Sequence, residues 1–213
     1  MDIGMIRISP DNTHHVCDGK PLYNKRFVRV MRYHQPGVAA IQDGATAYHI
    51  DVNGGPIYKQ RFVKAFGFYE GVAAVQDDKG YYHIDLQGNP RYAERYIWVG
   101  NFQDGLCVVR DAEKNYFHIL LDGRPAYAER YAYVGDYKYG IACVYTIRGA
   151  SHIDRKSRLI HGKWFLECNN YHKGYATARD RSGYFHVDLR GNPLYEERYQ
   201  WIEPFYNGVA LCK

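Results

Sequence analysis

The chain has 213 residues, of which 46% are hydrophobic, 24% are charged and 16% are aromatic, including 22 tyrosines. These proportions exclude disordered and collagen-like chains, and no apolar run approaches the roughly 18 residues of a membrane-spanning helix. The formal net charge of +5 is spread along the chain rather than clustered. Nucleic acid and membranes are therefore not the expected partners.

The N-terminal segment differs from the rest of the chain. It lacks the charged-then-apolar layout of a signal peptide, and residues 5–9, MIRIS, mimic an apolar strand of later units. We expect this segment to cap the first unit. His14, His15 and Cys17 follow, but no fourth ligand lies at a spacing typical of zinc, so no metal is predicted.

The sequence then repeats with a period of about 34 residues. Each unit has a histidine anchor, usually preceded by an aromatic residue and followed by Ile-Asp. After the anchor come a glycine-proline turn, a tyrosine, an arginine-aromatic pair and a glycine that opens a small apolar run. The anchors are His15, His49, His83, His118, His152 and His186.

Each unit is predicted to contain three short β-strands, as in residues 71–76, 81–86 and 91–99. The first strand is apolar at consecutive positions, which predicts an inner strand covered on both faces. The middle strand alternates, with His83 and Asp85 on one face and Tyr82 and Ile84 on the other. High tyrosine content also favours strands. No stretch has helical spacing over a useful length.

The predicted fold is therefore all-β, a tandem array of about six three-stranded units. An open solenoid or superhelix is favoured over a closed propeller-like ring, because three strands per unit do not match standard four-stranded blades. We expect residues 1–213 to form a single repeat domain. The sequence stops at Lys213, just after the strand GVALC and inside a unit, so the parent protein is expected to be longer.

Equivalent side chains of such an array are expected to stack into ladders. A His-x-Asp pair is also the usual arrangement of a general base or a metal ligand. An active site needs one converging constellation, whereas this pair recurs at regular spacing, so a structural role is favoured and no catalytic residue, metal or cofactor is predicted. The predicted structural ladder comprises His49, His83, His118, His152, His186, Asp51, Asp85, Asp154 and Asp188.

Arginines and tryptophans are the candidate contact residues. One interpretation has the arginines bonded to carboxylates of the same or an adjacent unit, since Glu94, Glu129 and Glu197 neighbour three of them. The other makes them a basic and aromatic stripe that faces a ligand. Large exposed aromatics favour partner contact. The predicted ligand- or partner-binding residues are Arg61, Arg95, Arg130, Arg198, Trp98, Trp164 and Trp201.

The unit around His152 departs most from the pattern. Ser151 replaces the aromatic residue, Ser157 the turn glycine, His161 the tyrosine and Trp164 the arginine. This unit is a candidate for a specialised patch.

The five cysteines are an odd number without paired spacing, in a chain large enough to fold without disulfides. They predict reduced thiols and a cytoplasmic location. The cysteines are Cys17, Cys107, Cys143, Cys168 and Cys212.

The combination of a small apolar strand, an aromatic strand ending in Ile-Asp, a glycine turn and a further aromatic strand resembles the tryptophan-glycine (WG) β-repeat family, found widely in bacterial proteins. GYYHIDLQGNP and GYFHVDLRGNP carry the resemblance, which covers nearly the whole chain. The name-giving Trp-Gly pair is replaced by Tyr81-Tyr82, which indicates a subtype with histidine before Ile-Asp. The resemblance implies a β-rich repeat domain, often attached to other domains, without catalytic residues.

Three functions are compatible with this pattern. The favoured one is a non-catalytic module for protein binding or scaffolding, which positions a fused domain or engages another protein. Carbohydrate or small-ligand binding is the alternative, and it predicts exposed, coplanar aromatic rings in grooves between units. An enzyme is the least favoured, since no common catalytic motif is present. It predicts a pocket in the fifth unit that gathers His152, His161, Cys168 and His172.

Overall fold

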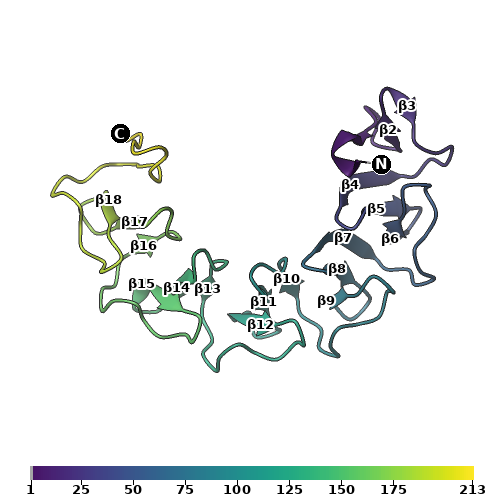
Figure 1. Ribbon diagram of the computed structural model, residues 1–213. Coiled ribbons are helices and arrows are strands. Elements are labelled where there is room, and N and C mark those ends of the chain that lie inside the picture. The colour runs from purple at the N-terminus through teal and green to yellow at the C-terminus, as the bar shows by residue number, and fades with distance from the viewer. Residues whose placement is uncertain (1) are drawn as a thin grey trace. The chain divides into compact units, whose positions relative to one another are not determined.

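The computed structural model describes residues 2–213 (Figure 1). Within these residues the fold is all-β, with 18 strands in six three-stranded sheets, a single 3-10 helix at Ile3–Met5 and no α-helix. None of the six sheets closes on itself. The prediction of six three-stranded β units is confirmed. None of the described residues forms a helix with the length and apolar character needed to cross a membrane.

The strands are antiparallel and follow one another along the chain. Sheet by sheet they are β1 Arg7–Ile8, β2 His15–Cys17 and β3 Lys20–Pro21; β4 Arg29–His34, β5 Val38–Asp43 and β6 Thr46–Ile50; β7 Lys64–Tyr69, β8 Val72–Gln76 and β9 Tyr81–Ile84; β10 Trp98–Val99, β11 Leu106–Arg110 and β12 Tyr116–Leu120; β13 Tyr133–Val134, β14 Ile141–Thr146 and β15 Gly149–Asp154; β16 Glu167–Cys168, β17 Ala176–Arg179 and β18 Tyr184–Val187.

In the second to sixth sheets the apolar run forms the central strand, namely β5, β8, β11, β14 and β17. In the first sheet the central strand is β2, and β1 of the N-terminal segment lies at the edge. In the third sheet, Ala73 of β8 pairs with Phe68 of β7 on one side and with Ile84 of β9 on the other. All three residues are buried. Small side chains at the Ala73 position leave room for the larger residues that cover the strand from both neighbours.

The third strand is much shorter than the range predicted for it, residues 91–99. Only Trp98–Val99 form a strand there, and the preceding residues are tied to β9 by isolated bridges such as Tyr81 to Tyr96. The cause is local. Pro90 has no N–H to donate, and the carbonyls of Ala93 and Glu94 accept hydrogen bonds from Arg95 instead of from a strand.

The strand that carries the histidine anchor, β9 in the third sheet, is buried on both faces. This finding corrects the predicted polar face. His83 is 1% exposed and Tyr82 is 5% exposed. The ring of Phe102 contacts His83, and the guanidinium of Arg95 covers the ring of Tyr82. Side chains of the same repeat thus supply the covering that a single β-sheet lacks.

The chain divides into two compact units. The first comprises Met1–Gly105 and Leu121–Gly123, and the second comprises Leu106–Leu120 and Arg124–Lys213. Each unit has a buried core built from the central strands and the aromatic residues of its own repeats.

Candidate functional site

Each ladder histidine is a buried hydrogen-bond centre. At His83, Nε2 lies 3.0 Å from the carbonyl oxygen of Gly100, and Nδ1 lies 2.6 Å from the hydroxyl of Tyr92. A carbonyl oxygen only accepts, so Nε2 carries the proton, and Tyr92 donates to Nδ1. The same pair of bonds recurs with Tyr23 and Met31 at His15, Tyr58 and Phe66 at His49, Tyr127 and Gly135 at His118, and Tyr195 and Glu203 at His186.

Burial keeps these imidazoles neutral. Loss of solvation lowers the pKa of His49, His83, His118 and His152 to about 4. The hydrogen bond from each ring to a backbone carbonyl opposes this shift but is the smaller effect. Both ring nitrogens are already bonded and all four side chains are shielded from water. A general base must reach its substrate, so this geometry favours a structural role for the ladder.

The aspartates of the ladder do not bond to the histidines. Asp85 instead accepts hydrogen bonds at Oδ1 from the backbone N–H groups of Gln87 and Asn89, at 2.9 and 2.8 Å. The glycine turn is thereby fixed. Asp51, Asp154 and Asp188 hold their own turns in the same way.

The turn glycine also packs against the preceding repeat. Gly88 has a φ of +81°, and a Cβ at this position would lie 2.9 Å from the ring of Tyr58. Glycine is therefore required both by the backbone conformation and by the close approach of a ladder tyrosine. This contact explains why the glycine and the tyrosine recur together.

The arginines are held within their repeats. Arg95 lies over the ring of Tyr82, with 3.4 Å from Cζ to the ring centroid, and its Nε donates to Asp77 at 2.9 Å. Its Nη1 donates to the carbonyls of Ala93 and Glu94. Arg61, Arg130 and Arg198 lie over Tyr48, Phe117 and Phe185 in the same way, at 3.8, 3.6 and 3.8 Å.

The carboxylate partners of Arg95, Arg130 and Arg198 are aspartates of the same repeat. Arg198 pairs with Asp180 at 2.8 Å, and Arg130 lies 4.0 Å from Asp111. Glu94, Glu129 and Glu197 contribute their backbone carbonyls rather than their carboxylates.

Arg26 makes the equivalent carbonyl bonds in the first repeat. The sequence interpretation did not include Arg26, although the pair Arg26-Phe27 was a signal for it.

The tryptophans occupy two different positions of the repeat. Trp98 and Trp201 are 44% and 49% exposed. Each directly precedes a buried residue, Val99 or Ile202. Trp164 is half-buried and stands in the arginine position, with the guanidinium of Arg148 at 5.2 Å from its ring. Only the first two therefore present a large aromatic surface.

Exposed apolar side chains recur at, or just before, the strand that opens each sheet (β4, β7, β10, β13 and β16) and at the equivalent Trp201, and we call them the outer row. They fall at one position of the repeat, directly after the aromatic residue that follows the arginine position, or at the next position. The outer row consists of Val28, Val63, Ile97 and Trp98 in the first unit, and of Tyr133, Leu166 and Trp201 in the second unit. The sequence interpretation found only its tryptophans, because an isolated valine carries no signal of exposure.

The fifth repeat has a histidine pair in place of the histidine-tyrosine pair. Nδ1 of His152 lies 3.1 Å from Nε2 of His161, and Nδ1 of His161 accepts from the N–H of Lys163. His172 does not join them, since its partners are Lys138 and Tyr206. The constellation that the enzyme alternative requires is therefore only partly assembled. Among residues 2–213, no group of three or more His, Cys, Asp or Glu side chains could hold a metal ion.

A groove of about 460 Å³ lies in the second unit beside this repeat. Tyr133 and Tyr145 border it, and their rings cross at 82° rather than lying parallel. The coplanar rings expected for sugar stacking are therefore not found in this groove. Its lining is Tyr133, Cys143, Tyr145, Cys168, Asn169 and Asn170.

Six sheets built from one repeated unit define a tandem β-repeat protein. Residues 50–81 match the model of the WG containing repeat family, which confirms the resemblance to that family. The other repeats carry the same histidine, tyrosine and arginine positions, with the fifth as the exception. No protein with a curated description matches this sequence.

Solved structures with a similar fold are distant in sequence. The computationally designed Ika8 protein has a TM-score of 0.54 at 10% identity, with 97% of this chain and 76% of that chain covered. BamB from Moraxella catarrhalis has a TM-score of 0.51 at 11% identity, with 92% and 73% covered. Hsv2 from Kluyvelomyces marxianus has a TM-score of 0.51 at 10% identity, with 89% and 69% covered. At these identities the likeness concerns the fold alone.

Proposed function

We propose that this chain is a non-catalytic repeat module that binds another protein through the outer row. One observation carries the proposal: the repeated polar side chains bond within their own repeats, whereas exposed apolar side chains recur at the outer-row position of successive repeats. His83, Tyr92 and Arg95 exemplify the first group. Val63 and Trp98, which are 48% and 44% exposed, exemplify the second.

The recurrence of these exposed side chains distinguishes them from ordinary surface residues. Single exposed apolar residues are normal on protein surfaces, but Val28, Val63 and Ile97 follow the buried aromatics Phe27, Phe62 and Tyr96 at the same position of three repeats in the first unit. A regularly spaced apolar row offers a partner repeated contacts, and aromatic members such as Trp98 are frequent centres of binding energy in interfaces.

Charge beside the row favours a partner with acidic groups. Arg29 and Lys64 begin β4 and β7, directly after Val28 and Val63, and both are exposed. Lysine and arginine at the rim of an apolar contact steer acidic partners and exclude basic ones. The proposed ligand of the first unit is thus a protein segment with apolar side chains interspersed with Asp or Glu.

A displayed peptide library, panned on the immobilised full chain, tests the proposal. The matched variant carries Val63→Ser, Ile97→Ser and Trp98→Ala, and the control carries Ile147→Ser, which removes a fully exposed apolar side chain outside the row. We expect enriched peptides that bind the native chain and the control but not the row variant. Equal binding to all three proteins, or no enrichment, would contradict the proposal. Circular dichroism checks that each variant is folded.

A further inference from the structure

Two cysteines occupy facing positions that hold other residues elsewhere in the chain. Cys143 pairs with the ladder histidine His152 across β14 and β15. The equivalent residues in the other complete sheets are Ala40, Ala74, Val108 and Thr177. Cys168 pairs with Ala178 across β16 and β17. Its equivalents are Val30, Ala65, Val134 and, in an isolated bridge, Ile202.

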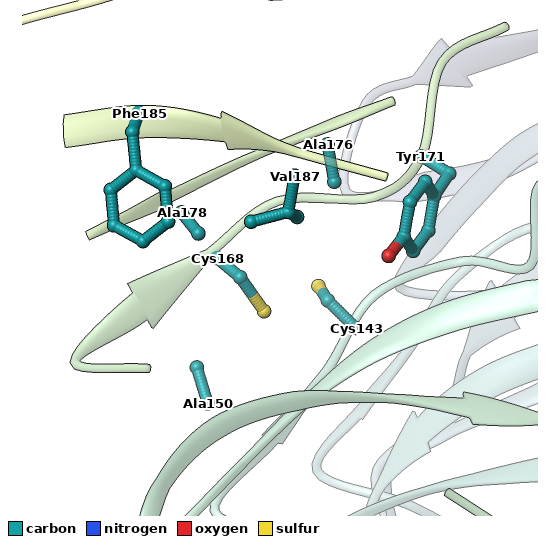
Figure 2. Packing of buried hydrophobic residues seen from close by; sticks show 8 residues of the cluster. All are labelled: Cys143, Ala150, Cys168, Tyr171, Ala176, Ala178, Phe185 and Val187. Carbon is teal, nitrogen blue, oxygen red and sulfur yellow. The ribbon is translucent and has the colours of Figure 1, made fainter. Parts of the chain in front are cut away.

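The two side chains meet in one buried cluster of the second unit. Figure 2 shows the sulfur atoms of Cys143 and Cys168 directed toward each other between Ala150 and Val187. Cys143 belongs to β14 of the fifth sheet, and Cys168 ends β16, the first strand of the sixth sheet. A bond between the sulfurs would therefore join two neighbouring sheets.

Local sequence makes room for the pair. A Cβ at Gly135 would lie 2.9 Å from the sulfur of Cys143, so a larger residue there would displace the thiol. Asn170 brings the two strands together, because its Oδ1 accepts from the N–H of Cys143 at 2.8 Å and its Nδ2 donates to the carbonyl of Asp136 at 2.8 Å.

Small molecules can approach the thiols. Both cysteines line the groove of about 460 Å³ described above. The groove is bordered by polar Asn169 and Asn170 on the side of the following sheet. The groove therefore offers a low-molecular-weight disulfide a route toward the two sulfurs.

We propose that Cys143 and Cys168 form an inter-repeat disulfide by exchange with a low-molecular-weight disulfide of the glutathione class. The Cys143 thiolate attacks one sulfur of the small disulfide, which gives a mixed disulfide and releases one small thiol. The Cys168 thiolate then attacks the Cys143 sulfur, forms the internal bond and releases the second small thiol. The protein loses two electrons and two protons, and the two small thiols carry them away.

The surroundings favour this uncharged product over a pair of thiolates. Burial raises the pKa of Cys143 to about 11 and raises the pKa of Cys168 further, with the neighbouring Cys143 adding to the effect. Two free thiolates would leave charge in an apolar cluster, which is costly. A disulfide places no charge there. The same raised pKa values make the exchange slow at neutral pH, because only the thiolate attacks.

Peptide mapping of the native full chain after incubation with oxidised glutathione tests the proposal. Trypsin cleaves at Arg148 and Lys163, so Cys143 and Cys168 fall in different peptides. We expect one cross-linked peptide pair that contains these two residues, with a mass lower by two hydrogens than the sum of the free peptides. The rate should rise about tenfold per pH unit near neutrality. The temperature of unfolding should rise on oxidation.

Variants separate this site from general cysteine oxidation. Cys143→Ala removes the cross-link, and alanine stands at this position in two other repeats, Ala40 and Ala74, so folding is expected to be retained. Cys107→Ala is the matched control, since it removes another buried cysteine and should leave the cross-link intact. A cross-link that forms only in the unfolded chain, or native oxidation that pairs other cysteines equally, would overturn the proposal.

Discussion

The third and fifth repeats share one backbone pattern but cover their ladder histidines with different side chains. In the third repeat, His83 bonds to Tyr92, and Arg95 stacks on Tyr82 and pairs with Asp77. In the fifth repeat, the corresponding residues are His152, His161, Trp164, Ser151 and Thr146. The histidine anchor keeps its carbonyl bond and its covering aromatic ring in both repeats, whereas its Nδ1 partner and the arginine, ring and aspartate positions have all changed.

This difference associates the arginine with the aromatic ring on which it stacks and, in the third, fourth and sixth repeats, with an aspartate. Without the ring and the aspartate, an arginine at position 164 would have neither a stacking surface nor an ion-pair partner, and the position holds tryptophan. Ser151 takes over part of the arginine's role, because its Oγ donates to the carbonyl of Lys163 at 2.8 Å. Arg148 provides a new cation beside the Trp164 ring.

A fall in pH is expected to lower the stability of both kinds of repeat more than any substitution discussed below. The pKa of His49, His83, His118 and His152 is about 4 in the folded chain, below the value of about 6.5 for an unfolded histidine. The unfolded chain therefore binds more protons between these values, and stability is lost as the pH falls through that window. We expect a loss of roughly 2 kcal/mol per histidine between pH 7 and pH 5.

Urea unfolding at pH 7 and pH 5, followed by circular dichroism, measures this loss. Equal midpoints at the two pH values would contradict the prediction. The fifth repeat sharpens the comparison, because burial lowers the pKa of His161 as well as that of His152. Two imidazoles there take up protons on unfolding, so we expect backbone amides of this repeat to lose protection from hydrogen exchange first, after correction for intrinsic rates.

Removal of one ladder histidine is the next largest effect. His83→Ala leaves a cavity and deprives Tyr92 and the carbonyl of Gly100 of their buried partner. Such a change is expected to lower the free energy of unfolding by about 3–5 kcal/mol. Tyr92→Phe keeps the ring and removes one bond, so a loss of about 1 kcal/mol is expected. Equal losses in the two variants, measured by urea unfolding at pH 7, would show that the tyrosine bond carries the effect.

The sequence was sufficient for the repeat and the number of sheets. Both are read from residue types that recur at a fixed spacing along the chain, such as the histidine at His83 and the apolar run that contains Ala73. It was not sufficient for the bonds, because those depend on which side chains face each other after folding. His83 and Asp85 are adjacent in a motif but bond elsewhere, while His83 and Gly100 are far apart in sequence and bond directly.

The arginines of the regular repeats are expected to contribute less to the free energy of unfolding than the ladder histidines. Arg95→Ala removes a cation–π contact, an ion pair and two carbonyl bonds, for which we expect a loss of about 1–2 kcal/mol. Arg61→Ala is the comparison, since Asp43 of its repeat bonds to Lys25 and Tyr48. Its loss should be smaller by roughly the worth of one partly exposed ion pair, about 0.5 kcal/mol. Thermal and urea unfolding of both variants measure the difference, and a larger loss for Arg61→Ala would contradict it.

Restoring the regular pattern in the fifth repeat is expected to give the smallest net effect and the most informative one. Trp164→Arg alone gains no stacking ring, and Ser151→Phe alone places a large ring beside Trp164 in a position that is 0% exposed. Each single change should therefore destabilise the chain. The double variant re-creates the pair seen between Arg130 and Phe117, so its loss should be less than the sum of the single losses by about 1 kcal/mol. A double-mutant cycle by urea unfolding measures this coupling, and strict additivity would mean that the arginine and the ring act independently, because residues that stabilise each other cannot have additive losses.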